Sequence, residues 1–128
     1  MLLAARLSNF GTRFHNYLYE GLGLDYICKA FTTIDLPAAI GGLRAFGVRG
    51  CAISMPFKEA YIPMADELNA SAEAISSVNT IVNTDGRLKG CNTDYIAITN
   101  LLNDHQVLGE LVLRCGAVGV WRRQWPVP

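Results

Sequence analysis

Apolar residues recur with helical spacing near the start of the chain and with strand-like alternation just after it. Residues 13–22 have the pattern of a helix, and Gly23 is placed to end it, because glycine readily adopts the conformation of a helix C-terminus. The preceding residues, 8–12, read Ser-Asn-Phe-Gly-Thr and predict a loop. Residues 25–33 alternate well enough for a strand and carry side chains suited to a pleated surface.

The next segments repeat this order of helix and strand. Asp35 is placed to cap a helix that runs to Phe46, and Gly47 stops it. Residues 48–54 form a short apolar run typical of a strand, and a turn at Pro56 follows. The alternation indicates an α/β chain.

The second half contains a short helix, a hairpin and a longer helix. Helices are predicted over 70–75 and over 94–103. Residues 78–83 and 87–91 are strand-like, and the turn 84–86, which reads Thr-Asp-Gly, joins them as a β-hairpin. The whole pattern predicts an α/β fold: a mostly parallel sheet with helices on both faces and one antiparallel hairpin.

Composition narrows the class of protein. The chain has 128 residues, enough for one domain with a real core; 51% are apolar and 17% are charged. The formal net charge is zero, without a long basic or acidic run, which argues against a nucleic-acid binder. No apolar stretch is long enough for a membrane span, and residues 1–5 lack the flanks of a signal peptide. We therefore expect a cytoplasmic protein whose partner is a small molecule, not nucleic acid or a membrane.

The cysteines do not suggest a metal site. They lie at positions 28, 51, 91 and 115, and no two of them form a CxxC motif. Most lie in or beside apolar runs, where cysteine acts as a small hydrophobic residue. We expect no bound metal and a reducing compartment.

Three polar clusters stand at the ends of predicted strands. They are the runs 54–59, 77–80 and 92–94. The first brings Lys58 just after an apolar strand, and the last brings Asp94 directly after the hairpin. Polar side chains that converge at strand ends are typical of a small-molecule site in an α/β domain.

The same clusters resemble the shikimate dehydrogenase family. The motifs that carry the resemblance, in chain order, are His15-Asn16, Ser54-Met55-Pro56-Phe57-Lys58 after Gly-Val-Arg-Gly, Val78-Asn79-Thr80 and Asn92-Thr93-Asp94. Each motif alone is weak, but four at family-like spacing are specific, and the resemblance covers residues 6–105. It implies the substrate-binding N-terminal domain of an NADP-linked enzyme. That enzyme reversibly oxidises shikimate to 3-dehydroshikimate in the shikimate pathway of aromatic amino-acid biosynthesis, and its cofactor lies on a second, Rossmann-type domain.

The resemblance assigns roles residue by residue. Lys58 matches the catalytic lysine of the family and Asp94 its partner aspartate, while Ser54 and Asn79 match substrate-binding positions. Oxidation of a secondary alcohol needs a group that accepts the hydroxyl proton, and a positioned lysine or aspartate can do so. The bland alternatives are a surface lysine at 58, a helix cap at 94 and a turn residue at 79. For His15, packing on its helix is favoured over catalysis.

One loop departs from the family pattern. The family commonly reads Ser-x-Ser-Pro before its His-Asn, and its two serines hold the substrate carboxylate. Here the two serines correspond to Asn9 and Gly11, and the proline to Thr12. Asn9, Thr12 or the backbone N–H of Gly11 is therefore predicted to bind the carboxylate differently. The loop 8–14 resembles the shikimate dehydrogenase-like branch, whose substrate is shikimate or a related cyclic hydroxy acid.

The end of the chain does not match the start of a nucleotide-binding domain. Residues 111–114 resemble its first strand, but Gly116 and Gly119 form a G-x-x-G, which is not a dinucleotide fingerprint. Trp121 and Trp125 each fix a TGG codon, and a shifted frame across them can encode G-S-G-G-M-A-K-A-V-A, a phosphate-binding turn followed by a helix.

We therefore expect two parts: a substrate-binding domain at 1–106, and an aborted, out-of-frame start of a nucleotide-binding domain at 107–128. A natural short protein is the alternative. The rival functions are a non-catalytic, stand-alone binding domain and an inactive truncated gene product. The DNA downstream of codon 128 distinguishes them, because a Rossmann-like continuation in another frame indicates a broken enzyme.

Overall fold

A six-stranded sheet forms the centre of the computed structural model, which describes residues 1–5 and 9–105. The strand order is β2-β1-β3-β5-β6-β4. The strands are β1 (Leu2–Leu3), β2 (Ala30–Phe31), β3 (Gly50–Ile53), β4 (Glu67–Leu68), β5 (Thr80–Thr84) and β6 (Arg87–Cys91). The helices are α1 (Asn9–Gly21), α2 (Leu36–Ala45), α3 (Phe57–Ala60), the 3-10 helix η1 (Ile62–Met64), α4 (Ala70–Ile75) and α5 (Thr93–Asp104).

Strand β5 is the one strand of this sheet that runs against the others. It pairs antiparallel with β3 on one side and with β6 on the other, whereas β1 pairs parallel with both β2 and β3, and β4 with β6. The β5–β6 pair is the predicted hairpin. Its turn places Asp85 and Gly86 at φ 51° and 88°, and Asp-Gly is the dipeptide that accepts such values in a two-residue turn.

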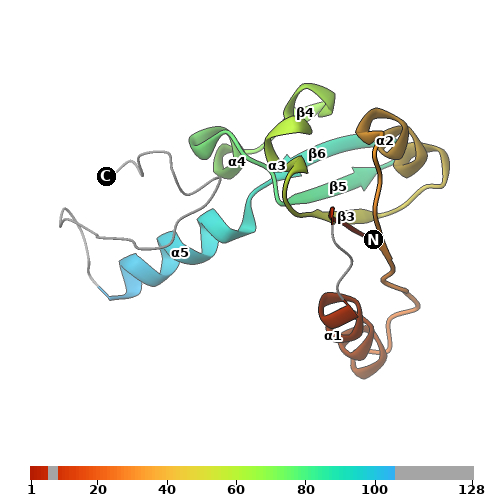
Figure 1. Cartoon of the computed structure of the whole chain (residues 1–128). Coiled ribbons are helices and arrows are strands. Elements are labelled where there is room, and N and C mark those ends of the chain that lie inside the picture. The colour runs from red at the N-terminus through yellow and green to blue at the C-terminus, as the bar shows by residue number, and fades with distance from the viewer. Residues whose placement is uncertain (6–8, 106–128) are drawn as a thin grey trace.

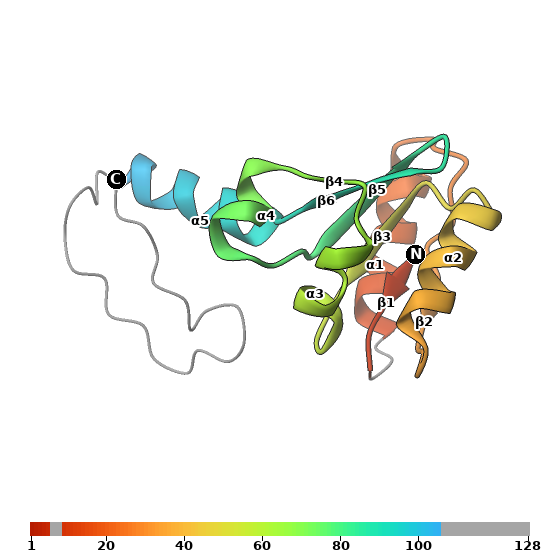
Figure 2. The same ribbon diagram turned by 90° about the horizontal axis from the view of Figure 1, so that it is seen from above.

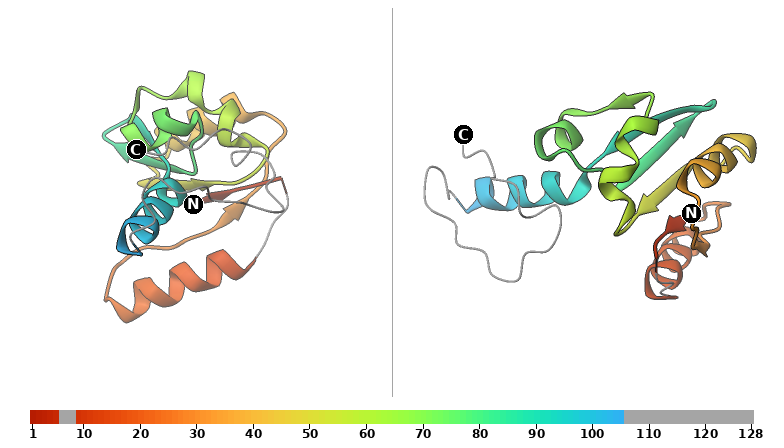
Figure 3. Two further views of the ribbon diagram at one scale, coloured as in Figure 1. Left: turned by 90° about the vertical axis from the view of Figure 1, so that its left-hand side faces the viewer. Right: turned by 45° about the horizontal axis from the view of Figure 1, so that its top comes forward.

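Helices cover both faces of the sheet, as predicted. Helices α2, α3 and α4 lie on one face and α1 lies on the other (Figure 1 and the left view of Figure 3). Helix α5 leaves the end of β6 and extends away from the sheet (Figure 2). The predicted fold class is confirmed.

The core lies between the sheet and α2. Leu36, Ile40 and Leu43 are the buried residues of α2, and they pack with alternate residues of the strands, among them Ile53 and Ile81. Because successive strand side chains point to opposite faces, the intervening residues of β3 and β5 face the side where α1 lies. That second face carries the cleft described below.

Local predictions were wrong at two places, and four short elements were not predicted. Residues 9–12 are helical and not a loop, because α1 begins at Asn9, and Ser8 lies outside the described residues. The strand predicted over 25–33 shrinks to Ala30–Phe31, since only these residues pair with β1. Strands β1 and β4 and the helices α3 and η1 were not predicted. The two-residue strand β1 has almost no local signature; it exists because both its neighbours hydrogen-bond to it.

The predicted strand at 111–114 and the two-part division at 106/107 lie at or beyond the end of the described residues. Within the described ranges, no helix combines the length and apolar character needed to cross a bilayer.

Candidate active site

A cleft of about 1050 Å³ lies between α1 and the face of β3 and β5 that does not pack on α2. Four of the six predicted site residues line it: Ser54, Lys58, Asn79 and Asp94. They come from three separate parts of the chain. The wall opposite them comes from α1 and from the segment that follows it, including His15, Tyr19 and Tyr26.

Lys58 and Asp94 form an ion pair in this cleft. Lys58 Nζ lies 3.1 Å from Asp94 Oδ2. The lysine side chain is 18% exposed and the aspartate 46%, so the pair is reached from the cleft while its cation is largely enclosed. The carbonyl of Lys58 accepts a hydrogen bond of 2.9 Å from Val78 N–H, which ties α3 to the entry of β5. The surface-lysine alternative therefore does not describe Lys58.

Asp94 is positioned by a neighbouring asparagine. Asn92 caps α5: its side-chain oxygen accepts from the N–H of Tyr95 at 3.0 Å, and its amide donates to the carbonyl of Ser77 at 3.0 Å. Its own N–H donates to Ser71 Oγ at 2.9 Å, and the residue is fully buried. The idea that Asp94 itself caps the helix is wrong, because Asp94 is the second residue of α5 and its carboxylate is left for Lys58.

Asn79 connects the start of β5 to the start of α5. Its side-chain oxygen accepts from Thr93 N–H at 2.9 Å, and its amide donates to Thr93 Oγ1 at 3.0 Å. The hydroxyl of Thr80 also donates to the Asn79 oxygen, at 2.9 Å. Asn79 is thus a bridging residue within the cleft, and one of its two amide hydrogens is left for a ligand.

Ser54 follows the last residue of β3 and lines the cleft. Its backbone is fixed on both sides: its N–H donates to the carbonyl of Leu3 at 2.9 Å, and its carbonyl accepts from Phe57 N–H at 3.0 Å. Its hydroxyl makes no hydrogen bond to another described residue, so it is available to a polar ligand.

The two residues predicted to bind a carboxylate are not in the cleft. Asn9 is the exposed first residue of α1, and Thr12 lies one turn further along it. The Oγ1 of Thr12 is buried and has no hydrogen-bond partner among the described residues. The substrate roles of Asn9 and Thr12 stay predictions, and this arrangement does not bring either one beside Lys58.

Helix α1 contributes His15, for which the sequence favoured packing, and Tyr19, which sequence reasoning missed. His15 and Tyr19 line the cleft, and their rings stack at 6.2 Å, while Tyr19 meets Tyr26 edge-on at 5.9 Å. The spacing of four residues, which places two side chains on one helical face, was the available signal. Asn16 holds this wall together, because its side chain bonds the N–H and the carbonyl of Cys28 at 2.6 and 3.0 Å.

Thr93 also lines the cleft, whereas the thiol of Cys51, a residue that borders the cleft, belongs to the core on the α2 side of the sheet. Thr93 stands between the cap Asn92 and Asp94, inside the motif that the sequence singled out, and its hydroxyl is held by Asn79. Burial raises the pKa of the Cys51 thiol to about 11, so this thiol is neutral near pH 7 and is not a nucleophile.

Residues 1–5 and 9–105 contain no evident set of groups that would bind a metal ion or a dinucleotide. No three His, Cys, Asp or Glu side chains in those ranges are grouped to hold a metal ion. In the sequence, the segments between β1 and α1 and between β3 and α3 contain no glycine-rich run. We therefore assign no described residue to the pyrophosphate of a nucleotide.

The residues 9–81 match the family model of the shikimate dehydrogenase substrate binding domain. The chain belongs to the shikimate dehydrogenase family. The predicted family membership is thus confirmed, and it rests on a match that spans more than half of the chain.

Relatives in this family are longer than the chain. A shikimate dehydrogenase-like protein of Haemophilus influenzae is 60% identical over 107 residues, which are 84% of this chain and 40% of that protein. A shikimate dehydrogenase (NADP(+)) of Streptococcus pyogenes is 46% identical over 99 residues, 74% of this chain and 34% of the relative. The chain spans about 40% of the length of the first of these relatives.

Solved structures have the same fold. The structure of a shikimate 5-dehydrogenase-like protein superposes with a TM-score of 0.81 at 60% identity, over 84% of this chain and 40% of the other. The shikimate 5-dehydrogenase of Listeria monocytogenes in complex with shikimate and NAD gives 0.76 at 34% identity, over 84% and 39%. An enzyme of Thermus thermophilus in complex with NADP(H) and shikimate gives 0.73 at 29% identity, over 82% and 41%.

Proposed function

We propose that residues 1–106 form the substrate half of an NADP-linked, shikimate dehydrogenase-like oxidoreductase. The substrate is shikimate or a related cyclic hydroxy acid, and the reaction is the reversible oxidation of a ring hydroxyl to a ketone. The observation that carries the proposal is the Lys58–Asp94 pair, 3.1 Å apart in the cleft and surrounded by hydroxyl and amide groups.

The chemistry requires a proton acceptor beside the hydroxyl. The carbon loses a hydride and the oxygen loses a proton, so a group at the oxygen must take that proton. We assign this role to Lys58 and Asp94; in support, their charged atoms lie 3.1 Å apart and both residues line the cleft. In the reverse direction the same pair returns the proton to the carbonyl oxygen.

Ser54, Asn79 and Thr93 give the cleft its specificity for a polyhydroxylated ring. A hydroxyl without a protein partner and a free amide hydrogen are donors and acceptors for ring hydroxyls. A ligand without matching hydroxyls would leave these groups unpaired, which lowers its affinity. Support for NADP comes from the relatives, and NADP supplies the hydride acceptor when bound; no described residue is assigned to hold it.

Binding of shikimate to the 128-residue chain tests the proposal directly. In a titration followed by amide chemical shifts, shikimate should move the signals of Ser54, Asn79, Thr93 and Asp94. Asn79→Ala should weaken binding by about tenfold, since it removes a ring contact and frees Thr93. Lys29→Ala, an exposed change outside the cleft lining, is the matched control. Shifts elsewhere, or none at all, would contradict the proposal.

Turnover separates catalysis from binding. In a fusion of residues 1–106 to the remaining part of the Haemophilus influenzae relative, Lys58→Ala should lower the turnover number about 100-fold or more, and KM much less. Lys29→Ala should change neither. Normal turnover in Lys58→Ala would remove the lysine from the mechanism and leave a binding domain as the better description.

A further inference from the structure

A buried serine on α4 connects the starts of two helices. The hydroxyl of Ser71 donates a hydrogen bond of 2.5 Å to Asn69 Oδ1 and accepts one of 2.9 Å from the N–H of Asn92. Asn69 caps α4, and Asn92 caps α5, the helix that carries Asp94. The two helices lie side by side where α5 begins (Figure 2). One hydroxyl therefore joins the cap of α4 to the cap of α5.

This connection requires a hydroxyl group. The Ser71 oxygen is a donor toward one cap and an acceptor toward the other, and a hydroxyl combines both functions in one atom. Asn92 is fully buried, so bulk water does not reach its N–H. A buried N–H that loses its partner is costly, and the start of α5 avoids that cost only by turning the group toward another acceptor. Loss of the hydroxyl should therefore move the first turn of α5.

A single peptide group holds the backbone on both sides of the Lys58–Asp94 pair. Its carbonyl, that of Ser77, accepts from the side-chain amide of Asn92 at 3.0 Å. Its N–H, that of Val78, donates to the carbonyl of Lys58 at 2.9 Å. Helix α5 with Asp94 and helix α3 with Lys58 are thus held at opposite ends of one peptide group. A shift of Asn92 consequently acts where the two halves of the pair are fixed relative to each other.

We propose that Ser71 is a positioning residue for the Lys58–Asp94 pair and acts on it through Asn92. The inference rests on the proposed function, because it concerns the proton transfer that we assign to this pair. Ser71 is not among the residues that line the cleft, so it does not touch the substrate. Its loss should slow proton transfer and leave the affinity for the substrate ring nearly unchanged.

A second buried serine provides a matched control. The hydroxyl of Ser77 has no hydrogen-bond partner among the described residues. Ser77→Ala removes the same atom as Ser71→Ala, yet it keeps the carbonyl that accepts from Asn92. Ile75→Val is the control for stability, because it shortens a buried side chain of α4 that makes no hydrogen bond, and its loss of stability should be comparable to that of Ser71→Ala.

Crystal structures of the 128-residue chain and its variants test the geometry. In Ser71→Ala, the distance from Lys58 Nζ to Asp94 Oδ2 should lengthen from 3.1 Å to more than about 4 Å, the limit of an ion pair. It should stay near 3.1 Å in Ser77→Ala, in Ile75→Val and in Ser71→Thr, which retains the hydroxyl. An unchanged distance in Ser71→Ala overturns the proposal.

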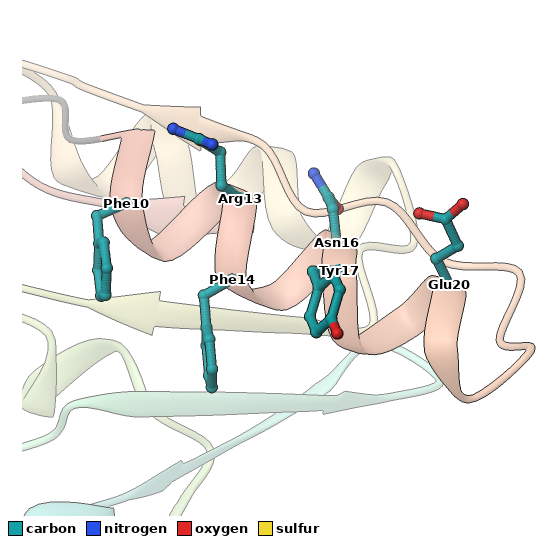
Figure 4. A pocket seen from close by; sticks show the side chains of 6 residues that line it. All are labelled: Phe10, Arg13, Phe14, Asn16, Tyr17 and Glu20. Carbon is teal, nitrogen blue, oxygen red and sulfur yellow. The ribbon is translucent and has the colours of Figure 1, made fainter.

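Turnover tests the consequence in the fusion to the Haemophilus influenzae relative. Ser71→Ala should lower the turnover number about tenfold and change KM by less than about twofold, and Ser71→Thr should recover most of the loss. Ser77→Ala should leave both constants unchanged, as should Glu20→Gln, which alters one exposed side chain of α1 (Figure 4). An equal loss of turnover in Ser71→Ala and Ile75→Val would reflect lower stability and would overturn the positioning role.

Lys58→Ala separates this inference from the proposed function. If Lys58→Ala is nearly inactive while Ser71→Ala behaves like Ser77→Ala, the proposed function stands and the positioning role of Ser71 is wrong. If Lys58→Ala turns over normally, the proposed function itself fails, and a role of Ser71 in proton transfer fails with it. Circular dichroism at the assay temperature checks that each variant is folded.

Discussion

Helices α1 and α2 flank the same sheet and end in the same way, yet they differ in how many apolar side chains they bury. Each ends in a glycine with positive φ, Gly23 at 65° and Gly47 at 59°. In each, the N–H of the next residue bonds the carbonyl five positions back: Leu24 to Tyr19, and Val48 to Leu43. This is the Schellman arrangement in both helices. However, α2 buries three apolar side chains and α1 buries none.

This difference indicates that α2 contributes mainly to stability and α1 mainly to recognition. Helix α2 is held by apolar burial against the sheet, which makes it part of the core. Helix α1 is held more loosely, through the amide of Asn16 and a close approach at Gly11, where an added Cβ would lie 3.1 Å from a methyl of Leu2. Most of its side chains are therefore left to face the cleft or the solvent, where they can contact a ligand or a partner.

Truncation of the α2 core should give the largest effect on stability. Leu43→Ala removes a side chain that is 2% exposed and should lower the free energy of unfolding by about 2–5 kcal/mol. Phe14→Ala, on the outer face of α1, should lower it by less than about 1 kcal/mol, because half of that ring is already in water. Urea unfolding followed by circular dichroism measures both. Equal losses would mean that α1 belongs to the core after all.

The two asparagines that fix each region should rank next. Asn92→Ala removes the cap of α5 and leaves the buried carbonyl of Ser77 without its donor, for a loss of about 2–3 kcal/mol. Asn16→Ala frees the backbone of Cys28 beside α1 and should cost about 1 kcal/mol. Asn92→Ser keeps a capping oxygen and should recover part of the loss. Denaturant midpoints compare all three variants. If Asn92→Ala left the midpoint unchanged, the cap would not be what positions Asp94.

A change of pH should affect the α2 side of the sheet through Cys51. Burial raises the pKa of this thiol from 9.0 to about 11. In the unfolded chain it ionises near its ordinary pKa, so its contribution to stability is full below pH 9 and is lost between about pH 9 and 11. Between pH 8 and 10, Cys51→Ala should lose about 1 kcal/mol less stability than the wild type.

Phe14→Ala provides the matched control for that titration. Its pH-dependent loss should equal that of the wild type, because the change lies on the exposed face of α1 and leaves Cys51 buried. If Cys51→Ala followed the wild-type curve from pH 8 to 10, the thiol would ionise as easily in the folded chain as in the unfolded one. In that case burial would not raise the pKa of the Cys51 thiol.

Sequence patterns predicted the elements whose cause is local. The helix 70–75 was placed correctly, and its structure shows why: Asn69 caps its start and Ser76 ends it with a left-handed conformation. The hairpin was placed from its Thr-Asp-Gly turn, and the stops at Gly23 and Gly47 from the residue type alone. In each case the residues that determine the conformation lie within a few positions of it.

The predictions failed where the cause is distant in sequence. Strand β1 is defined by pairing with β2 and β3, whose partners lie about thirty and fifty residues away. Lys58, Ser54, Asn79 and Asp94 were placed together through their positions in motifs, and that grouping in one cleft is what the structure shows. The start of α1 was missed as well, because the helix begins four residues earlier than predicted. The substrate roles of Asn9 and Thr12, which were assigned from a loop pattern, stay predictions.

The smallest effect should come from the glycines that end α1 and α2, and it should be the same in both. Alanine at a positive φ costs about 1 kcal/mol, partly offset by the lower entropy of the unfolded chain. An added Cβ meets no atom within 4 Å at Gly23 or Gly47, so only this backbone strain differs from the wild type. Gly41→Ala, inside α2 and equally unobstructed, should instead stabilise the chain by about 0.5–1 kcal/mol. Thermal unfolding of the three variants therefore tests whether the helices differ only in packing. If Gly23→Ala were much milder than Gly47→Ala, the end of α1 would already be frayed in the native state. The contrast between the two helices would then begin at their ends.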